Sequence, residues 1–113
     1  ENCQFNAAFV ADVTIPDGTV LQPGVAFVKT WEIKNTGEVA WPEGVTLKHV
    51  DGPALGPIER VSLRPREPGE TVEISVEMQA PTEPGLYTSY WQLCVDSQCF
   101  GSRFWVQIRV RKE

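Results

Sequence analysis

Apolar and polar side chains alternate along several stretches of the chain, most clearly over residues 71–78. Val72, Ile74, Val76 and Met78 fall on one side of this stretch, and polar residues occupy the positions between them. A period of two is typical of a β-strand with one buried face, because successive side chains of a strand point to opposite sides. The stretch therefore predicts a strand with its apolar side toward a core.

The same alternation predicts further strands elsewhere in the chain. No segment has the spacing of three to four residues that an amphipathic helix shows. Nine prolines and nine glycines divide the chain into short segments, a pattern typical of a β-sandwich or a β-barrel. We expect strands over residues 4–15, 27–35, 46–50, 61–63, 71–78, 86–95 and 98–110.

Two of these strands place aromatic residues on the expected core face. In the strand over 27–35, Trp31 and Ile33 point inward, while Thr30, Glu32 and Lys34 point outward. In the strand over 4–15, the expected inward residues are Phe5, Ala7, Phe9, Ala11, Val13 and Ile15.

The last two strands form a long predicted hairpin around a turn at Asp96 and Ser97. A bulge at Gly101 would shift the register by one residue and exchange the two faces beyond it. Without such a shift, the opposed pairs on the inner face include Leu93–Phe100 and Trp91–Ser102, and those on the outer face include Cys94–Cys99, Gln92–Gly101, Tyr90–Arg103 and Thr88–Trp105.

Trp105 is the unusual residue of this hairpin, because it falls on the polar face together with Tyr90. Either another part of the chain covers this aromatic pair, or the pair marks a contact surface for a partner. The turn at 16–18, together with Asp12, places carboxylates near one edge, where they are turn formers and solvated charges or contacts for a partner's amine or basic side chain. The candidate partner-binding residues are Trp105, Tyr90, Arg103, Thr88, Gln92 and Asp17.

The predicted hairpin also places Cys94 opposite Cys99. In a non-hydrogen-bonded pair the Cα atoms are about 4.5 Å apart, at the short end of the range for a disulfide. A disulfide would indicate an oxidising compartment, whereas two free thiols would suit a cytosolic protein. Both alternatives stay open, and Cys3 has no assigned partner.

Length, charge and composition narrow the function classes. The 113 residues fit one domain, spanning 1–113. A net charge of −5 argues against a nucleic-acid partner, and no apolar run reaches the roughly 18 residues needed for membrane insertion. His49 is the single histidine, and no nucleophile motif, phosphate loop or metal-ligand spacing occurs. We expect neither catalysis nor a cofactor.

Four motifs, taken in order, resemble a known family over about residues 7–110. They read AAFVADVTIPDGT, PGVAFVKTWEIKNTGEVAWPEG, APTEPGLYTSYWQL and FGSRFWVQIRV. They resemble the four-tryptophan (FW) domain, the central domain of next-to-BRCA-one (Nbr-type) autophagy receptors, which also has bacterial relatives. The resemblance implies an all-β, immunoglobulin-like β-sandwich of about seven or eight mostly antiparallel strands. The tryptophans that correspond are Trp31, Trp41, Trp91 and Trp105.

In such a sandwich, Trp31 and Trp91 are expected to pack in the core, Trp41 to pack in the core or cap one end, and Tyr87 to form a tyrosine corner. The sequence departs from the family pattern in the loop HVDGPALG at 49–56, where members usually read close to GGD, and in its Cys94/Cys99 pair.

The resemblance implies a non-catalytic module that recruits a cargo protein, a partner protein or a peptide. The alternatives are a carbohydrate-binding domain or a structural spacer of an exported protein. A eukaryotic receptor would be cytoplasmic and autophagosome-associated, and a bacterial homologue would be extracytoplasmic. The oligomeric state and the identity of the partner stay open.

Overall fold

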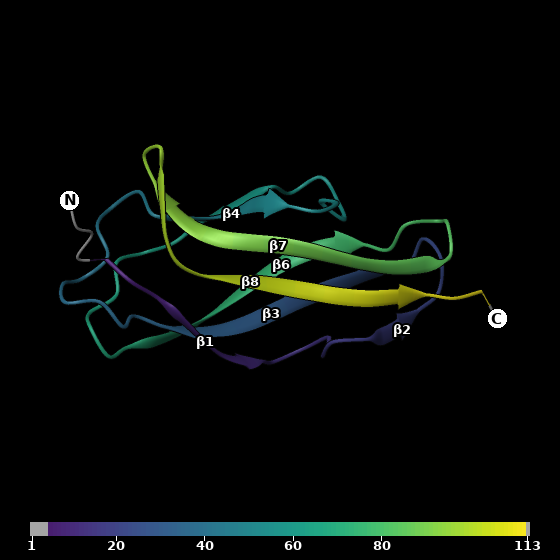
Figure 1. The fold of residues 1–113 in the computed structure, drawn as a ribbon, viewed down its shortest axis with the longest axis horizontal. Coiled ribbons are helices and arrows are strands. Elements are labelled where there is room, and N and C mark those ends of the chain that lie inside the picture. Colours follow the sequence, from purple (N-terminus) through teal and green to yellow (C-terminus); the bar gives the residue numbers. More distant parts are fainter. Residues whose placement is uncertain (1–4, 113) are drawn as a thin grey trace.

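The computed structural model describes residues 5–112 and arranges them in two β-sheets (Figure 1). The smaller sheet has the order β1-β3-β6, formed by Ala8–Asp12, Ala26–Lys34 and Thr71–Gln79. The larger has the order β2-β8-β7-β4-β5, formed by Thr19–Leu21, Gln98–Val110, Gly85–Val95, Thr46–Asp51 and Arg60–Ser62. This all-β arrangement confirms the predicted immunoglobulin-like β-sandwich. In the described part of the chain, no helix is long and apolar enough to cross a membrane.

The alternation pattern located most of these strands, and two regions differ. The predicted strand over 4–15 is shorter and spans Ala8–Asp12, while its first position, Gln4, lies outside the described residues, as does Cys3. The sequence did not predict β2, which has three residues and pairs in parallel with β8, Thr19 opposite Ile108. Three residues are too few to display an alternation, so β2 depends on its pairing with β8.

Two fully buried tryptophans form the centre of the sandwich. The rings of Trp31 on β3 and Trp91 on β7 lie 6.0 Å apart, so they join the two sheets. Trp31 Nε1 donates a hydrogen bond to the carbonyl oxygen of Trp105, and Trp91 Nε1 donates to Ser89 Oγ, both at 2.9 Å. Each buried indole therefore has the hydrogen-bond partner that burial requires.

Trp41 and Tyr87 lie toward the two ends of the sandwich. Trp41 is buried, packs near Phe100 and donates from Nε1 to the carbonyl oxygen of Asn6 at 3.0 Å. The hydroxyl of Tyr87 donates to the carbonyl oxygen of Glu83, four residues upstream, at 2.7 Å. That contact is the geometry of a tyrosine corner, and it fixes the loop that leads into β7.

The register of the β7–β8 hairpin changes by two residues at a bulge. Leu93 opposes Phe100 as predicted, but Trp91 opposes Phe104 rather than Ser102. The predicted Tyr90–Arg103 and Thr88–Trp105 pairs are therefore wrong, because Trp105 opposes Tyr90 and Gln107 opposes Thr88. A shift of two residues preserves the side of the sheet to which each side chain points. Phe104 and Val106 stay buried, and Trp105 stays outside.

The first strand also differs from its predicted alternation. A bulge between Phe9 and Ala11 interrupts the pairing of β1 with β3. Phe9 and Val13 were expected to point inward, but they are 47% and 44% exposed. Phe9 keeps the expected inward side, because it opposes buried Ile33, and it is exposed at the open side of the sandwich next to β8. Beyond the bulge Asp12 opposes Trp31, so Asp12 points inward and Val13 is turned outward.

Candidate functional site

Trp105 lies on the outer face of β8, where it is 44% exposed. Tyr90 stands opposite it on β7, with the ring centroids 6.2 Å apart and the ring planes tilted by 59°. Trp105 Nε1 donates a hydrogen bond to Asp17 Oδ2 at 3.3 Å. Three of the predicted site residues, from three separate segments, therefore meet at one place.

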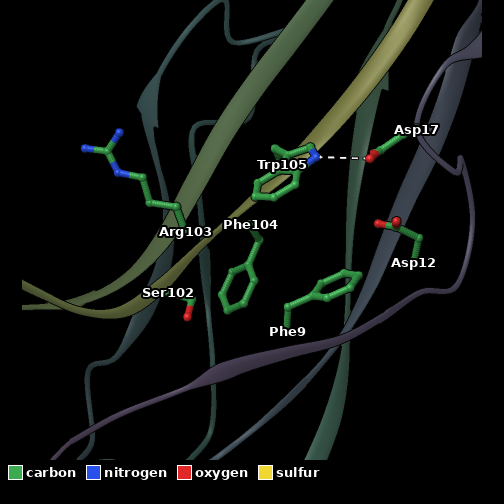
Figure 2. Close-up of a pocket in the computed structure, with 7 residues that line it drawn as sticks. All are labelled: Phe9, Asp12, Asp17, Ser102, Arg103, Phe104 and Trp105. Atoms are coloured by element: carbon green, nitrogen blue, oxygen red, sulfur yellow. Dashed lines mark hydrogen bonds between the residues drawn. The ribbon is translucent and has the colours of Figure 1, made fainter.

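A cavity of about 300 Å³ lies beside Trp105, between β1 and β8 (Figure 2). Phe9 contributes one apolar wall from β1, and Phe104, almost fully buried, contributes another from β8. The carboxylates of Asp12 and Asp17 lie to one side of these rings (Figure 2). The cavity thus combines apolar walls with carboxylates at one end, and its lining consists of Phe9, Asp12, Asp17, Ser102, Arg103, Phe104 and Trp105.

Lys29 organises the chain at the carboxylate end of this cavity. Its side chain is fully buried on β3, and its Nζ lies 2.6 Å from Asp12 Oδ1. The same ammonium donates to the carbonyl oxygens of Thr14 and Ile15, each at 2.9 Å. A buried cation is costly unless it is paired and hydrogen-bonded, and here all three donor sites of the ammonium are used. Lys29 therefore fixes the segment that follows β1.

Asp12 and Asp17 consequently differ in whether their carboxylates are free to bind a partner group. Asp12 is engaged by Lys29 through one carboxylate oxygen, so the expectation of two solvated turn carboxylates is wrong for it. Within residues 5–112, Asp17 forms no ion pair and accepts only the indole hydrogen bond of Trp105 among side-chain contacts. Asp17 is therefore the carboxylate that is available to an incoming cation.

The other predicted site residues lie around this centre with different contacts. Arg103 points away from Asp17 (Figure 2) and reaches Asp51 at 3.5 Å, in an exposed ion pair. Thr88 Oγ1 accepts a hydrogen bond from Gln107 at 3.4 Å. Gln92 is half-buried and donates to the carbonyl oxygen of Gly101, so its amide is engaged in supporting the bulge.

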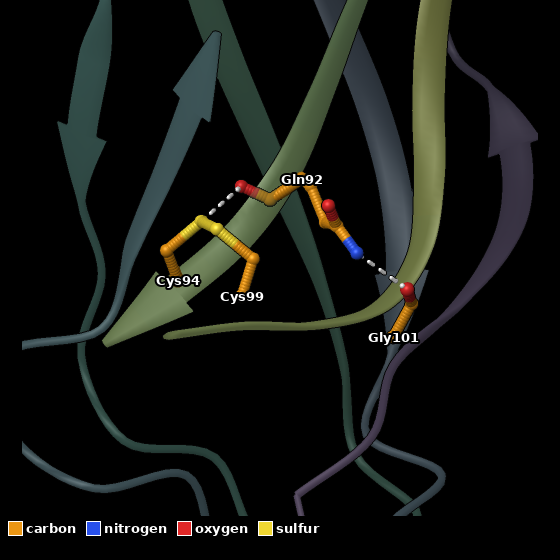
Figure 3. Close-up of a disulfide and its surroundings, with 4 residues drawn as sticks. All are labelled: Gln92, Cys94, Cys99 and Gly101. Atoms are coloured by element: carbon orange, nitrogen blue, oxygen red, sulfur yellow. Dashed lines mark hydrogen bonds between the residues drawn. A yellow bond between two sulfur atoms is a disulfide. The ribbon is translucent and has the colours of Figure 1, made fainter. Parts of the chain in front are cut away.

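A disulfide joins Cys94 and Cys99 at the tip of the hairpin (Figure 3). The bulge at Gly101 separates this pair from Trp105 along β8. Gly101 has a φ of +76°, and a Cβ there would lie 2.9 Å from the backbone nitrogen and oxygen of Ala7. The close approach permits the hydrogen bond from Ser102 N to the carbonyl oxygen of Ala7 at 3.1 Å. The bulge thus directs β8 toward the N-terminal segment.

Sequence reasoning missed two residues of this site, Lys29 and Phe9. Lys29 shares the inward side of β3 with Phe27, Trp31 and Ile33, so a charged residue on a core face was a visible signal. Phe9 had no such signal, because its exposure depends on the open space between β1 and β8, which the alternation within one strand does not reveal.

The two sheets, the tyrosine-corner contact and the aromatic cavity at an open side define an immunoglobulin-like β-sandwich domain with a concave surface site. The chain belongs to the family described as the Ig-like domain from next to BRCA1 gene, whose model matches residues 14–110.

Individual proteins with this domain are also similar in sequence to the chain. The chain is 41% identical to the protein ILRUN of Danio rerio over 106 residues, covering 93% of this chain and 38% of that protein. It is 44% identical to the human next to BRCA1 gene 1 protein over 108 residues, covering 93% of this chain and 11% of that protein. It is 30% identical to the autophagy receptor Nbr1 of Schizosaccharomyces pombe over 98 residues, covering 81% and 24%. The chain therefore corresponds to one part of each of these longer relatives.

Proposed function

We propose that this chain is a non-catalytic protein-interaction module of the four-tryptophan type, which binds a partner protein or peptide through the Trp105 surface. This surface is defined by Trp105, Tyr90, Phe9 and Asp17 together with the cavity between β1 and β8. The observation that carries the proposal is a large, half-exposed aromatic side chain beside an apolar cavity that ends in an available carboxylate. Aromatic anchors next to pockets dominate the energetics of protein interfaces.

The chemistry of the surface favours a partner group that is both apolar and cationic. The cavity walls suit an aliphatic side chain, because Phe9 and Phe104 offer it apolar contact. Asp17 favours a cation, and the indole of Trp105 offers a face on which a cation can stack. The net charge of −5 supports the same preference at longer range.

A non-catalytic role agrees with the contacts of the single histidine. His49 Nε2 lies 2.7 Å from the carbonyl oxygen of Gly52, and its ring packs at 5.6 Å against the ring of Trp91. The residue is therefore held in a structural position near the core.

The Schizosaccharomyces pombe relative is named an autophagy receptor, and we extend that role to this chain as recognition of a cargo or partner protein. Carbohydrate binding is the weaker alternative. The rings of Tyr90 and Trp105 are tilted by 59° and so form no flat platform for a sugar ring. A spacer role would leave the aromatic cavity without a use.

A selection from random peptides tests the proposal, because it requires no partner to be named in advance. The domain is immobilised, a phage-displayed library of random 12-residue peptides is selected on it, and enriched peptides are measured by isothermal titration calorimetry. We expect the substitution Trp105→Ala to weaken these peptides by at least about tenfold, since truncation of an aromatic anchor costs about 2 kcal/mol or more.

Leu86→Ala is the matched control for this selection. Leu86 is also an exposed apolar residue of the hairpin, 52% exposed on β7, and it does not line the cavity. Its substitution is expected to leave the affinity unchanged. Failure to enrich any peptide, or equal binding by the wild type and the Trp105→Ala variant, would overturn the proposal.

A further inference from the structure

The cavity lies in an opening between the N-terminal segment, residues 7–18, and residues 102–107 of β8. We call this opening the window. At one end of the window, Ser102 N donates to the carbonyl oxygen of Ala7 at 3.1 Å; at the other, Gly18 N donates to the carbonyl oxygen of Gln107 at 3.0 Å. Between these two bonds the N-terminal segment runs eleven steps, from residue 7 to residue 18, whereas β8 runs five, from 102 to 107. The longer segment therefore bows away from β8.

Lys29 holds this bow on the side of the smaller sheet. Its ammonium binds Asp12 and the carbonyl oxygens of Thr14 and Ile15, all within the bowed segment. Val13 N also donates to the carbonyl oxygen of Thr30 on β3, at 3.0 Å. The bow is therefore tied to β3 rather than to β8, and the window is open in the folded domain before any partner arrives.

The edge of β8 that faces the window has no strand beside it. β7 pairs along one side of β8, while β2 pairs along the other only from Ile108 onward. Residues 103–106 thus lack a second strand partner within the described part of the chain. On this edge the carbonyl oxygen of Trp105 accepts the indole hydrogen bond of Trp31, and its second lone pair remains for another donor. A strand edge without a neighbouring strand is a template for an added strand.

The opposite side of the window is also unprotected. Phe9 and Val10 on the edge strand β1 are 47% and 43% exposed, and Val13 beyond it is 44% exposed. Edge strands are usually protected by charged residues or proline, but β1 carries only Asp12, which pairs with buried Lys29. Apolar residues at an unpaired edge suit a surface that a partner covers.

We infer that the partner segment enters this window in extended form and pairs as an added strand with residues 103–106 of β8. The inference rests on the proposed function and specifies how the site is occupied. Side chains of an added strand alternate between the two sides of the sheet. One side chain then enters the cavity between Phe104 and Phe9, and its neighbour lies outside against Trp105.

The two positions call for different residue types. The inward position takes an aliphatic side chain, because the rings of Phe9 and Phe104 surround it. The outward neighbour takes lysine or arginine, whose stem packs on the Trp105 indole while its cation meets Asp17, 3.3 Å from the indole nitrogen. The partner is therefore an extended peptide with an aliphatic residue adjacent to a basic one.

Backbone methylation of the bound peptide tests the strand pairing directly. The probes are the peptides enriched from the random 12-residue library, resynthesised with single N-methyl groups at each position in turn. Strand addition predicts losses of tenfold or more at alternate positions only, because every second amide of an edge strand points toward its neighbour. Asp17→Asn is expected to weaken peptides with the basic residue at least fivefold, and to leave unchanged the same peptides with norleucine at that position.

The outcomes separate this inference from the proposed function. Enriched peptides that require Trp105 but show no alternation of N-methyl losses would overturn strand pairing and leave the interaction module intact. Equal effects of Asp17→Asn on the basic and norleucine peptides would overturn the assigned basic position. Absence of any Trp105-dependent peptide would overturn both.

Discussion

Trp31 and Trp105 are joined by a hydrogen bond, yet they occupy opposite kinds of environment. Trp31 is fully buried between the sheets, and its indole nitrogen donates to the carbonyl oxygen of Trp105. Trp105 is 44% exposed, and its own indole nitrogen donates to Asp17, a residue of the turn before β2. One tryptophan connects the two sheets of the core, and the other connects the sandwich to the edge of a cavity.

The difference shows how one residue type can serve stability in one region and contact in another. The folded state is stabilised by burial of the large apolar surface of Trp31 and by the hydrogen bond of its indole N–H. Trp105 leaves much of its ring in solvent, so its burial adds less to folding and a partner can still cover it. The core and the open side of the sandwich should therefore respond differently to the same substitution.

The largest expected effect is a difference in the free energy of unfolding between alanine variants of these two tryptophans. Trp31→Ala should lower the free energy of unfolding by about 4 kcal/mol, since removal of a buried Trp leaves a large cavity. Trp105→Ala should cost about 1 kcal/mol or less, as is usual for a half-exposed side chain. Urea denaturation followed by far-UV circular dichroism measures both. Similar losses for the two variants would show that Trp105 is a core residue in energetic terms.

The next effect concerns the boundary between the two regions, where Lys29 ties the bowed segment to β3. Lys29→Met should cost about 3 kcal/mol, because it leaves Asp12 and two carbonyl oxygens without their buried cation. The double variant Lys29→Met/Asp12→Asn should lose less than the sum of the single losses, since Asp12→Asn removes the unpaired charge. A double-mutant cycle from urea denaturation checks this coupling, and strictly additive losses would contradict it.

The fold was predictable because the strongest pattern, a period of two, is local. Trp105 was correctly expected on the outer side of the hairpin, even though its predicted partner across the hairpin was wrong. The bulge at Gly101 shifts the register by two residues, and an even shift changes neighbours without exchanging faces. A shift of one residue would have turned Trp105 into the core.

The cavity was not predictable in the same way. It depends on two backbone hydrogen bonds that join the N-terminal segment to β8, and on a bulge in β1 that turns Asp12 inward toward Lys29. These contacts link residues far apart in the chain, and the alternation within one strand contains no information on them. Lys29 was the exception, because a charged residue on an inward position already called for a buried partner.

The smallest of these effects concerns the tip of the hairpin, which the bulge separates from the Trp105 surface. The disulfide between Cys94 and Cys99 closes a short loop, with a sequence separation of 5, so its removal should cost about 2 kcal/mol in the chain-entropy description. The double variant Cys94→Ala/Cys99→Ala and the wild type under dithiothreitol should therefore unfold at similar urea concentrations, both below the oxidised wild type. Peptides that depend on Trp105 should bind all three forms within about twofold, because Gln92 still supports the bulge through the carbonyl oxygen of Gly101. A large loss of affinity on reduction would mean that the tip of the hairpin and the open side of the sandwich act as one unit.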